Sequence, residues 1–291
     1  MTRILHLSDL HFGFHRRALT DDLLHRVNDV RADLVVVTGD VTHRAKPAQY
    51  ARAAQFLKGI ETDWIAMPGN HDVPLFNPLL RLLRPWARFR QTISDQLAPS
   101  WRSGNVQVLA LNSADPFAIQ RGVLRRGQVA AAMARINPDL TNIVALHHPL
   151  QHRPGVDKNL ARRAALTLEM LESVGAQIVL SGHLHVWSAG ALLDPVAGGR
   201  VLQIQAGTAL CARPGDMRNE FCVLDIRGPE LTIERHVAPM DHPGFLPPEY
   251  LHFSRVSGRW HPGGHDPDQE TEPLPTEPGA TDTALSTAKT G

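Results

Sequence analysis

The sequence has 291 residues, 43% of them hydrophobic, which is enough to bury a large core in one domain or in two small ones. Its formal net charge of +1 argues against binding to nucleic acid or membranes through overall charge, so nucleic acid is not a favoured partner. The cysteines Cys211 and Cys222 exclude a disulfide framework and fit a reducing compartment, and we expect both to be packing residues.

The amino terminus carries no pattern of a signal peptide, because Met1–Thr2–Arg3 leads directly into a short apolar run without a cleavage site. No apolar run approaches the ~20 residues that a membrane-spanning helix needs. We therefore expect a cytoplasmic protein without a transmembrane segment. The oligomeric state is left open, a homodimer included.

Short apolar runs, each closed by Gly, Pro, Ser or Asp, are typical of strands that are buried on both faces. In chain order they are Ile4–Leu7, Leu34–Val37, Trp64–Met67, Ile143–Leu146 and Ile178–Leu180. Helical patterns lie between them at Lys46–Lys58, with Pro47 in its first turn, and at Lys158–Val174, which ends before Gly175. Alternation of strand and helix predicts an α/β layered fold.

The rhythm changes after residue 186, where strands follow one another without helices. They are Val186–Leu193, Arg200–Gln205, Glu220–Arg227 and Leu231–Val237. We expect these four to form a second, mostly antiparallel sheet that packs on the first.

We expect one domain over residues 1–240, followed by an extension over 241–257. Within the domain, Phe76–Gly104 is rich in arginine and aromatic residues and predicts a helical, lid-like insertion. Residues 258–291 are rich in proline, glycine and acidic residues, which predicts a disordered tail.

Polar residues follow each of the five early strands. They are Asp9-Leu10-His11, Gly39-Asp40, Gly69-Asn70-His71-Asp72, His147-His148-Pro149 and Gly182-His183-Leu184-His185. In an extended chain, residues two apart point the same way, so each Asp-x-His or His-x-His pair could face one metal ion. Because ligands bind at the carboxyl ends of the strands in open α/β sheets, we expect all five groups to meet.

The chemistry of these side chains favours transition metals. Carboxylate, imidazole and amide oxygen suit Mn, Fe or Zn, and two such ions about 3.5–4 Å apart can clamp a phosphoryl group and generate hydroxide. Each motif alone is an ordinary turn or helix cap. Five of them in this order are not explained by coincidence.

The five motifs resemble, in order and spacing, those of the calcineurin-like metallophosphoesterases, and the resemblance spans about Arg3 to Val237. It implies a four-layer α/β/β/α sandwich with two central mixed sheets. It also implies two divalent or trivalent transition metal ions per chain, of which Mn, Fe and Zn are candidates, and hydrolysis of a small phosphoester by a metal-activated hydroxide.

The resemblance also implies roles for individual residues. Asp9, His11 and His185 would bind one metal ion, Asn70, His147 and His183 the other, and Asp40 would bridge both. His71 would protonate or stabilise the leaving oxygen, oriented by Asp72. We favour His147 over His148 as the ligand, because the family pattern is His-x-Pro.

Four further residues are candidates for contact with substrate. His148 would then be a neighbour in the pocket, while Arg16, Arg17 and Arg81 could reach a phosphate. A solvent-exposed role is about as plausible for the first two arginines. For Arg81 and the rest of its segment, a lid with a solvated basic face is the preferred interpretation.

The motifs define chemistry but not the substrate. A phosphodiesterase similar to the class III cyclic nucleotide enzymes is favoured, because of the chain length and the presence of His71. Alternatives are a pyrophosphohydrolase of the UDP-diacylglucosamine type, with Trp86, Phe89 and Leu79–Leu83 as an acyl pocket, and a DNA nuclease. A protein-binding scaffold of the same fold is the non-enzymatic alternative, and the complete ligand set argues against it.

Overall fold

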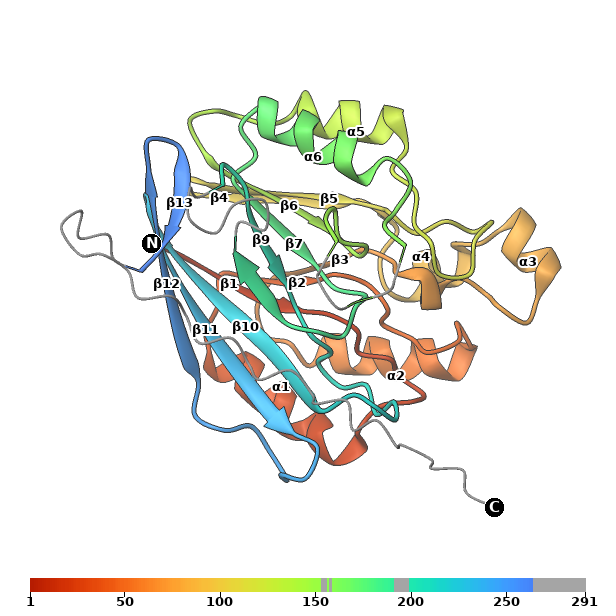
Figure 1. Ribbon diagram of the computed structural model, residues 1–291. Helices are drawn as coiled ribbons and strands as arrows, with labels where there is room; N and C mark the ends of the chain where they lie inside the picture. The colour runs from red at the N-terminus through yellow and green to blue at the C-terminus, as the bar shows by residue number, and fades with distance from the viewer. Residues whose placement is uncertain (153–155, 157–158, 191–198, 264–291) are drawn as a thin grey trace, which may run out of the picture.

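The computed structural model of this chain describes residues 1–152, 156, 159–190 and 199–263. Two mixed β-sheets face each other, and helices cover the outer face of each (Figure 1). Helices α1 (Thr20–Asp29) and α2 (Pro47–Lys58) lie on one side, and α5 (Arg126–Met133) and α6 (Ala164–Ser173) on the other. The expected four-layer α/β/β/α sandwich is therefore confirmed.

The first sheet has seven strands in the order β13-β12-β11-β10-β1-β2-β3. Its parallel part consists of β1 (Thr2–Leu7), β2 (Leu34–Val37) and β3 (Trp64–Ala66). Its antiparallel part consists of β10 (Arg218–Arg227), β11 (Glu230–Pro239), β12 (Glu249–Val256) and β13 (Arg259–Pro262). The antiparallel pairing of β1 with β10 joins the two parts.

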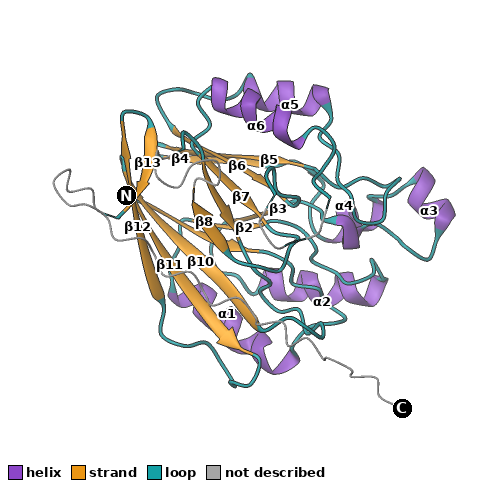
Figure 2. Cartoon of the chain, viewed as in Figure 1, coloured by secondary structure: helices purple, strands orange, loops and turns teal. Residues whose placement is uncertain are grey.

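The second sheet has six strands in the order β4-β5-β6-β7-β9-β8. Its parallel centre consists of β5 (Val106–Leu111), β6 (Thr141–Leu146), β7 (Ile178–Ser181) and β9 (Leu202–Gln205). The short antiparallel strands β4 (Ser100–Ser103) and β8 (Ser188–Gly190) form its edges (Figure 2).

The apolar core between the two sheets explains why the strands are continuous hydrophobic runs. Side chains alternate between the faces of a strand, so Ile4 points to the other sheet while Leu5 packs under α1 and α2. Strands that are covered on both faces need apolar residues at every position, and Leu34–Val37 is buried throughout. This packing fixes the distance between the two sheets.

Two sequence-based expectations about the sheets are wrong in detail. The strands after residue 186 do not form a sheet of their own: β8 and β9 join the second sheet, while β10 and β11 join the first. The five early strands are likewise divided, with β1, β2 and β3 in one sheet and β6 and β7 in the other. Strand patterns do not encode partners, which are chosen by the packing of the whole chain.

The segment Phe76–Gly104 contains two short helices, α3 (Pro78–Leu83) and α4 (Ala87–Thr92), as expected, but it ends in the unexpected strand β4. Helix α3 projects from the body of the molecule (Figure 1). It begins where the Asn77 side chain accepts a hydrogen bond from the Leu80 amide at 2.9 Å, with Pro78 in the first turn. The role of the segment as a lid stays a prediction.

Regular structure continues beyond the expected end of the folded part. The extension contains β12, and Arg259–Pro262 form β13, although we expected a disordered tail from residue 258. Trp260 is the reason, because its ring is 2% exposed and its indole N–H donates to the carbonyl of Gln177 at 2.9 Å. The rest of the expected tail, 264–291, lies outside the described residues.

We expected a helix over Lys158–Val174, but α6 begins only at Ala164. Residue 158 itself lies outside the described residues. Arg163, just before α6, has a left-handed backbone with φ 66° and so cannot continue a helix toward the amino terminus. Within the part of the chain that the structure describes, no helix is long and apolar enough to cross a bilayer.

The buried histidine His6 on β1 makes the fold sensitive to acid. Its Nε2 lies 2.8 Å from the Thr38 hydroxyl, and burial lowers the pKa of His6 from 6.5 to about 3, against the opposing charge of Asp9. The folded protein therefore keeps this ring neutral while the unfolded chain protonates it. The contribution of neutral His6 to the free energy of unfolding is fully present above pH 6.5 and is lost as the pH falls toward 3.

We expect His6→Leu to reduce the slope of the unfolding free energy against pH by about 1.4 kcal/mol per pH unit in this interval. Urea unfolding at a series of pH values measures the slope. His25→Leu is the matched control, because His25 has an exposed side chain on α1 and should leave the slope as in the wild type. An unchanged slope in His6→Leu would contradict the assignment.

Candidate metal centre

All five motifs lie at carboxyl ends of strands, along one edge of the two facing sheets. Asp9 and His11 follow β1, Asp40 follows β2, and Asn70 opens the short 3-10 helix Asn70–Asp72 after β3. The second sheet supplies the histidines that follow β6 and β7, which are His147, His183 and His185. The structure brings all seven predicted ligand side chains together, with ligands from both sheets.

The backbone at these positions is not extended. Asp9, His11 and Asp40 have φ of 54°, 47° and 51°, and His183 and His185 have 73° and 61°. Left-handed backbone is uncommon outside glycine, although Asp and His adopt it more readily than most other residues, and it is often found at functional sites. The paired side chains therefore converge through tight left-handed turns, and not through the alternation of an extended strand that we expected.

Two glycines of the motifs allow this close approach of chain segments. A Cβ atom added at Gly69 would collide with the carboxylate and the amide of Asp40, and one at Gly182 would collide with the side chains of Ser8 and Asp9. Any larger residue would displace a carboxylate of the cluster. The glycines of the motifs thus serve packing around the carboxylates.

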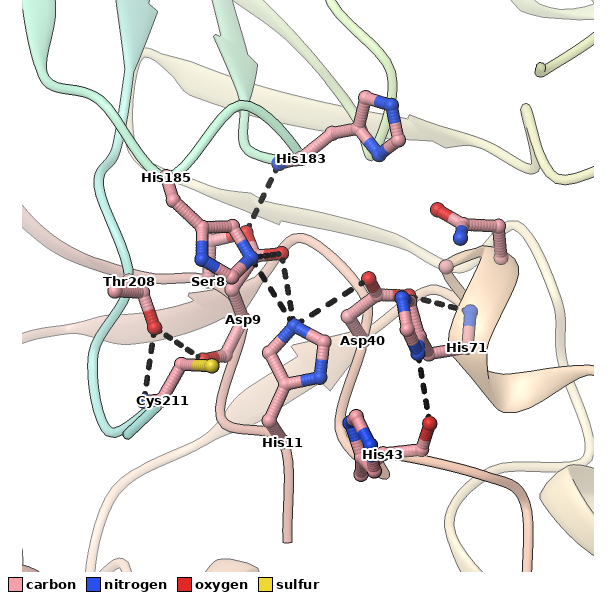
Figure 3. A network of polar contacts seen from close by, with 12 residues as sticks. Ser8, Asp9, His11, Asp40, His43, His71, His183, His185, Thr208 and Cys211 are labelled. Carbon is pink, nitrogen blue, oxygen red and sulfur yellow. Dashed lines mark hydrogen bonds and ion pairs between the residues drawn. The ribbon is translucent and has the colours of Figure 1, made fainter. Parts of the chain in front are cut away.

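Asp9 is held by one carboxylate oxygen and presents the other. Oδ2 accepts hydrogen bonds from the Ser8 hydroxyl at 2.6 Å and from the His183 amide at 2.9 Å. Oδ1 faces imidazole nitrogens, with Nε2 of His185 at 3.2 Å and Nε2 of His11 at 3.5 Å. Figure 3 shows the rings of His11 and His185 converging on this carboxylate.

Asp40 repeats the arrangement. Its Oδ1 accepts a hydrogen bond from the His71 amide at 2.8 Å, while Oδ2 lies 3.3 Å from Nε2 of His147 and 3.6 Å from Nε2 of His11. Since His11 also faces Asp9, the Asp40 carboxylate lies between the two groups of imidazoles. This is the position that a bridging ligand requires.

His147 and Asn70 form the other half of the cluster. Nδ1 of His147 donates to the Thr38 carbonyl at 2.7 Å, which directs Nε2 toward Asp40 and toward Oδ1 of Asn70 at 3.2 Å. The Asn70 amide nitrogen donates to the Ile119 carbonyl at 3.3 Å, so its oxygen is the atom turned to the cluster. The ring of His183 lies near that of His147, with centroids 5.1 Å apart.

His148, the alternative ligand and candidate substrate neighbour, is engaged elsewhere. Its Nδ1 lies 2.9 Å from the Ser113 hydroxyl and its Nε2 lies 2.8 Å from the Gln120 carbonyl, so neither nitrogen has a free lone pair. The residue is 1% exposed. Burial and the neighbouring His147 lower the pKa of His148 to about 3. This geometry favours His147 as the ligand and argues against contact between His148 and a substrate.

His185 has a partner that the motifs did not reveal. Its Nδ1 donates to Asp216 at 3.0 Å, which turns Nε2 toward Asp9 and toward Nε2 of His11 at 3.1 Å. A carboxylate behind an imidazole commonly fixes the ring of a metal-binding histidine. Asp216 lies 31 residues beyond His185 in a turn, and no local pattern identifies it.

The two buried carboxylates of the cluster are stabilised in their charged form by neighbouring imidazoles. Although burial acts in the opposite direction, His185 holds the pKa of Asp9 and His147 holds the pKa of Asp40 well below the usual range. Burial lowers the pKa of His147, but Asp40 and its other acceptors outweigh this effect and raise it to about 9. Anionic oxygens, an amide oxygen and imidazole nitrogens converging at 3.1–3.6 Å are a donor set suited to transition metal cations.

Thr208 and Cys211 lie beside the cluster. The Thr208 hydroxyl donates to the Asp9 carbonyl at 2.7 Å and accepts from the Cys211 amide at 2.9 Å (Figure 3). The Cys211 sulfur lies within 4.8 Å of a ring nitrogen of His11 and of His185. Cys211 is thus buried as expected, but beside the cluster and not in a purely apolar core; Cys222 packs in the core between the sheets.

His71 stands at the margin of the cluster. Its Nδ1 donates to the His43 carbonyl at 2.7 Å, its ring stacks on that of His43 with centroids 5.4 Å apart, and it lies 4.7 Å from the ring of His11. The tie at Nδ1 leaves Nε2 for a ligand in the adjoining pocket. His43, three residues after Asp40, was not singled out from the sequence.

Asp72 does not orient the His71 ring, contrary to expectation. Its oxygens accept hydrogen bonds from the amides of Val41, Thr42 and Gly69 at 3.1, 2.9 and 3.0 Å, and from the Thr42 hydroxyl at 2.9 Å. Asp72 therefore fixes the turn that follows Asp40 against the turn that carries Asn70. It is a positioning residue for the backbone of two motifs.

A pocket of about 400 Å³ opens beside Asn70 and His71. Arg81 lines it, but its guanidinium is engaged, donating to the carbonyls of Pro74 at 3.2 Å and Ala118 at 2.6 Å. Arg16 is turned away and donates to the carbonyls of Pro239 and His242. Arg17 is exposed and does not line this pocket. The three arginines proposed as phosphate contacts therefore lack that geometry, and Arg81 instead braces the pocket wall.

The proposed acyl pocket of the insertion is not formed. Phe89 is fully buried, with its ring 6.5 Å from that of Tyr50 on α2. Leu79, Leu82 and Leu83 on α3 are exposed by 61–69%. The aromatic and leucine residues of the segment thus point to different places.

Comparison with known proteins finds relatives that are similar to this chain in sequence. A cAMP/cGMP dual specificity phosphodiesterase of Mycobacterium tuberculosis is 30% identical over 211 residues, a match that spans 62% of this chain and 61% of that relative. A probable cyclic nucleotide phosphodiesterase of Vesicomyosocius okutanii is 22% identical over 199 residues, spanning 62% and 78% of the two chains.

Among solved structures, the purple acid phosphatase PPD1 of yellow lupin shares the fold, with a TM-score of 0.63 at 13% identity over 86% of this chain and 53% of the lupin chain. The family model for calcineurin-like phosphoesterases matches residues 2–187, a range that includes every motif of the cluster. This match covers more than half of the sequence, and the chain belongs to the calcineurin-like phosphoesterase family.

Proposed function

We propose that the protein is a dinuclear metal-dependent phosphodiesterase. The observation that carries the proposal is the pair of buried carboxylates, Asp9 and Asp40, each fixed by one oxygen to the backbone and turned by the other toward imidazole nitrogens. A buried cluster of this composition is stable when cations are bound between its members.

The ligand sets follow from the two halves of the cluster. Asp9, His11 and His185 would hold one ion, and Asn70, His147 and His183 would hold the other. Asp40, whose Oδ2 lies within 3.6 Å of both His11 and His147, would serve both. Two transition metal ions, with Mn, Fe or Zn as candidates, supply charge neutralisation at a phosphoryl group and a water of lowered pKa.

His71 would act on the leaving group. The hydrogen bond from Nδ1 to the His43 carbonyl sets its ring orientation, and Nε2 can then hold a proton for the oxygen that departs from phosphorus. His71 lines the pocket together with Asn70, so a substrate that occupied the pocket would reach the cluster and this imidazole at once.

The substrate we propose is a phosphodiester, with cyclic nucleotides first among the candidates. The support is that two relatives are named for this activity and that a pocket of about 400 Å³ lies in the range of small-molecule sites.

Metal content and substrate class are tested together. We expect the protein loaded with Mn²⁺ to retain about two ions per chain after desalting, and to hydrolyse bis(4-nitrophenyl) phosphate and cyclic AMP. Metal analysis by mass spectrometry and release of 4-nitrophenolate measure the two. A panel with UDP-sugar pyrophosphates and DNA separates the alternatives. Protein that binds no metal and hydrolyses no member of the panel would refute the proposal.

Asp40→Ala should remove both metal binding and turnover, because one carboxylate serves both ions. Metal content and hydrolysis of bis(4-nitrophenyl) phosphate are measured on the same preparation. Asp29→Ala is the control, because this carboxylate is exposed at the end of α1. Full turnover in Asp40→Ala would disprove the bridging role.

His71→Ala should keep the metal but lose activity in a way that depends on the leaving group. The alkoxide of cyclic AMP needs a proton and 4-nitrophenolate does not, so we expect kcat to fall by ~10²–10⁴ for the former and much less for the latter. Equal losses on both substrates, or loss of metal, would rule out the role as general acid.

A further inference from the structure

The pocket beside His71 is lined by cationic side chains without a matching anion. Arg44, Arg81 and Arg213 come from three separate segments of the chain, and no carboxylate is among the described residues that line the pocket. His43 and His71 form part of the same wall. A substrate that entered this pocket would therefore meet positive charge outside the metal cluster.

Two of these arginines are free to bind. Arg81 is fixed by two carbonyl groups, whereas the side chains of Arg44 and Arg213 form no ion pair or hydrogen bond with another residue that the structure describes. The Arg44 guanidinium lies 6.0 Å over the ring of Phe76, which is itself 73% exposed. Both arginines are half-buried, so their charges are only partly screened by water.

Like charges held close together in one pocket repel each other unless an anion lies between them. Arginine is also the residue best suited to bind phosphate or carboxylate through paired N–H donors. The scissile phosphate does not by itself account for the arginines in this pocket. Asp9, Asp40 and the imidazoles around them already form a separate site for cations, and those cations would neutralise the charge of the scissile phosphate.

We propose that Arg44 and Arg213 bind a second anionic group of the substrate, a phosphate or a carboxylate, that is distinct from the phosphodiester cleaved at the metal cluster. The inference rests on the proposed phosphodiesterase function and extends it to substrates that carry an additional negative charge. Cyclic AMP, whose only charge is on the scissile phosphodiester, would be cleaved without using this second site. Arg81 supports this site by holding the segment of Pro74 against that of Ala118.

A matched pair of substrates tests the inference. Thymidine 5′-(4-nitrophenyl phosphate) and its 3′-phosphorylated form release the same 4-nitrophenolate and differ by one phosphate. With the Mn²⁺-loaded protein we expect kcat/KM to be higher for the 3′-phosphorylated form by on the order of tenfold, as charge-assisted hydrogen bonds to arginine predict. In Arg44→Gln/Arg213→Gln this preference should disappear.

The control is Arg102→Gln/Arg227→Gln, which removes the same charge from exposed positions on β4 and at the end of β10. These positions lie beside the amino-terminal ends of β5 and β1, away from the motifs at the carboxyl ends of the strands. It should keep the wild-type preference. Equal losses on both substrates in Arg44→Gln/Arg213→Gln would mean that these arginines bind the scissile phosphate itself and would overturn the inference, as would a wild-type preference near one.

A binding measurement separates this inference from the proposed function. By calorimetry, the Mn²⁺-loaded wild type should bind thymidine 3′,5′-bisphosphate more tightly than thymidine 5′-phosphate by about tenfold, and the difference should vanish in Arg44→Gln/Arg213→Gln but not in the control. This result does not require turnover. A wild type that shows the binding difference but has no phosphodiesterase activity would refute only the proposed function. Equal affinities of the wild type for the two nucleotides would refute only the second anion site.

Discussion

The burial of two carboxylates between two apolar sheets is the constraint on which the rest of the structure depends. Asp9 and Asp40 are almost completely inaccessible, and a buried charge is tolerated only when it is hydrogen-bonded and paired. Backbone amides of His183 and His71 satisfy one oxygen of each. The other oxygens are left to imidazoles, so the arrangement of the histidines follows from the charges that they surround.

The same constraint explains the irregular backbone around the cluster. Amides can reach the carboxylates only if the turns after β1, β2 and β7 close tightly, and left-handed residues with glycine neighbours provide this. Asp72 accepts hydrogen bonds from the turn after β2 and from Gly69 after β3, and so joins these two turns. Thr208 donates to the Asp9 carbonyl and so joins the turn after β1 to the segment after β9. Hydrogen bonds between distant segments of the chain hold the turns of the site in place, while the strands supply only their direction.

Much of the layered fold could be predicted from the sequence, because buried parallel strands and their helices have local signatures. The two sheets could not be assigned correctly, since an apolar run such as Leu202–Gln205 fits either sheet equally well. The residues that meet at the cluster were predicted from their order along the chain. The positions of Asp216 and Cys211 beside His185 were not predicted, because only the folded chain brings these residues together. Arg16 and Arg81 were misassigned because a positive charge near a motif does not reveal which carbonyl group will bind it.

The division of the cluster between the sheets has a mechanical consequence. Asp9, Asp40 and Asn70 belong to one sheet, and His147, His183 and His185 to the other. The interface between the sheets is mainly an apolar layer, and hydrogen bonds such as the one from Trp260 to Gln177 cross it. Side-chain packing and these hydrogen bonds oppose sliding of one sheet over the other. Cations bound by side chains from both sheets would cross-link the sheets at one end of the sandwich. Metal occupancy and the position of one sheet relative to the other would then depend on each other.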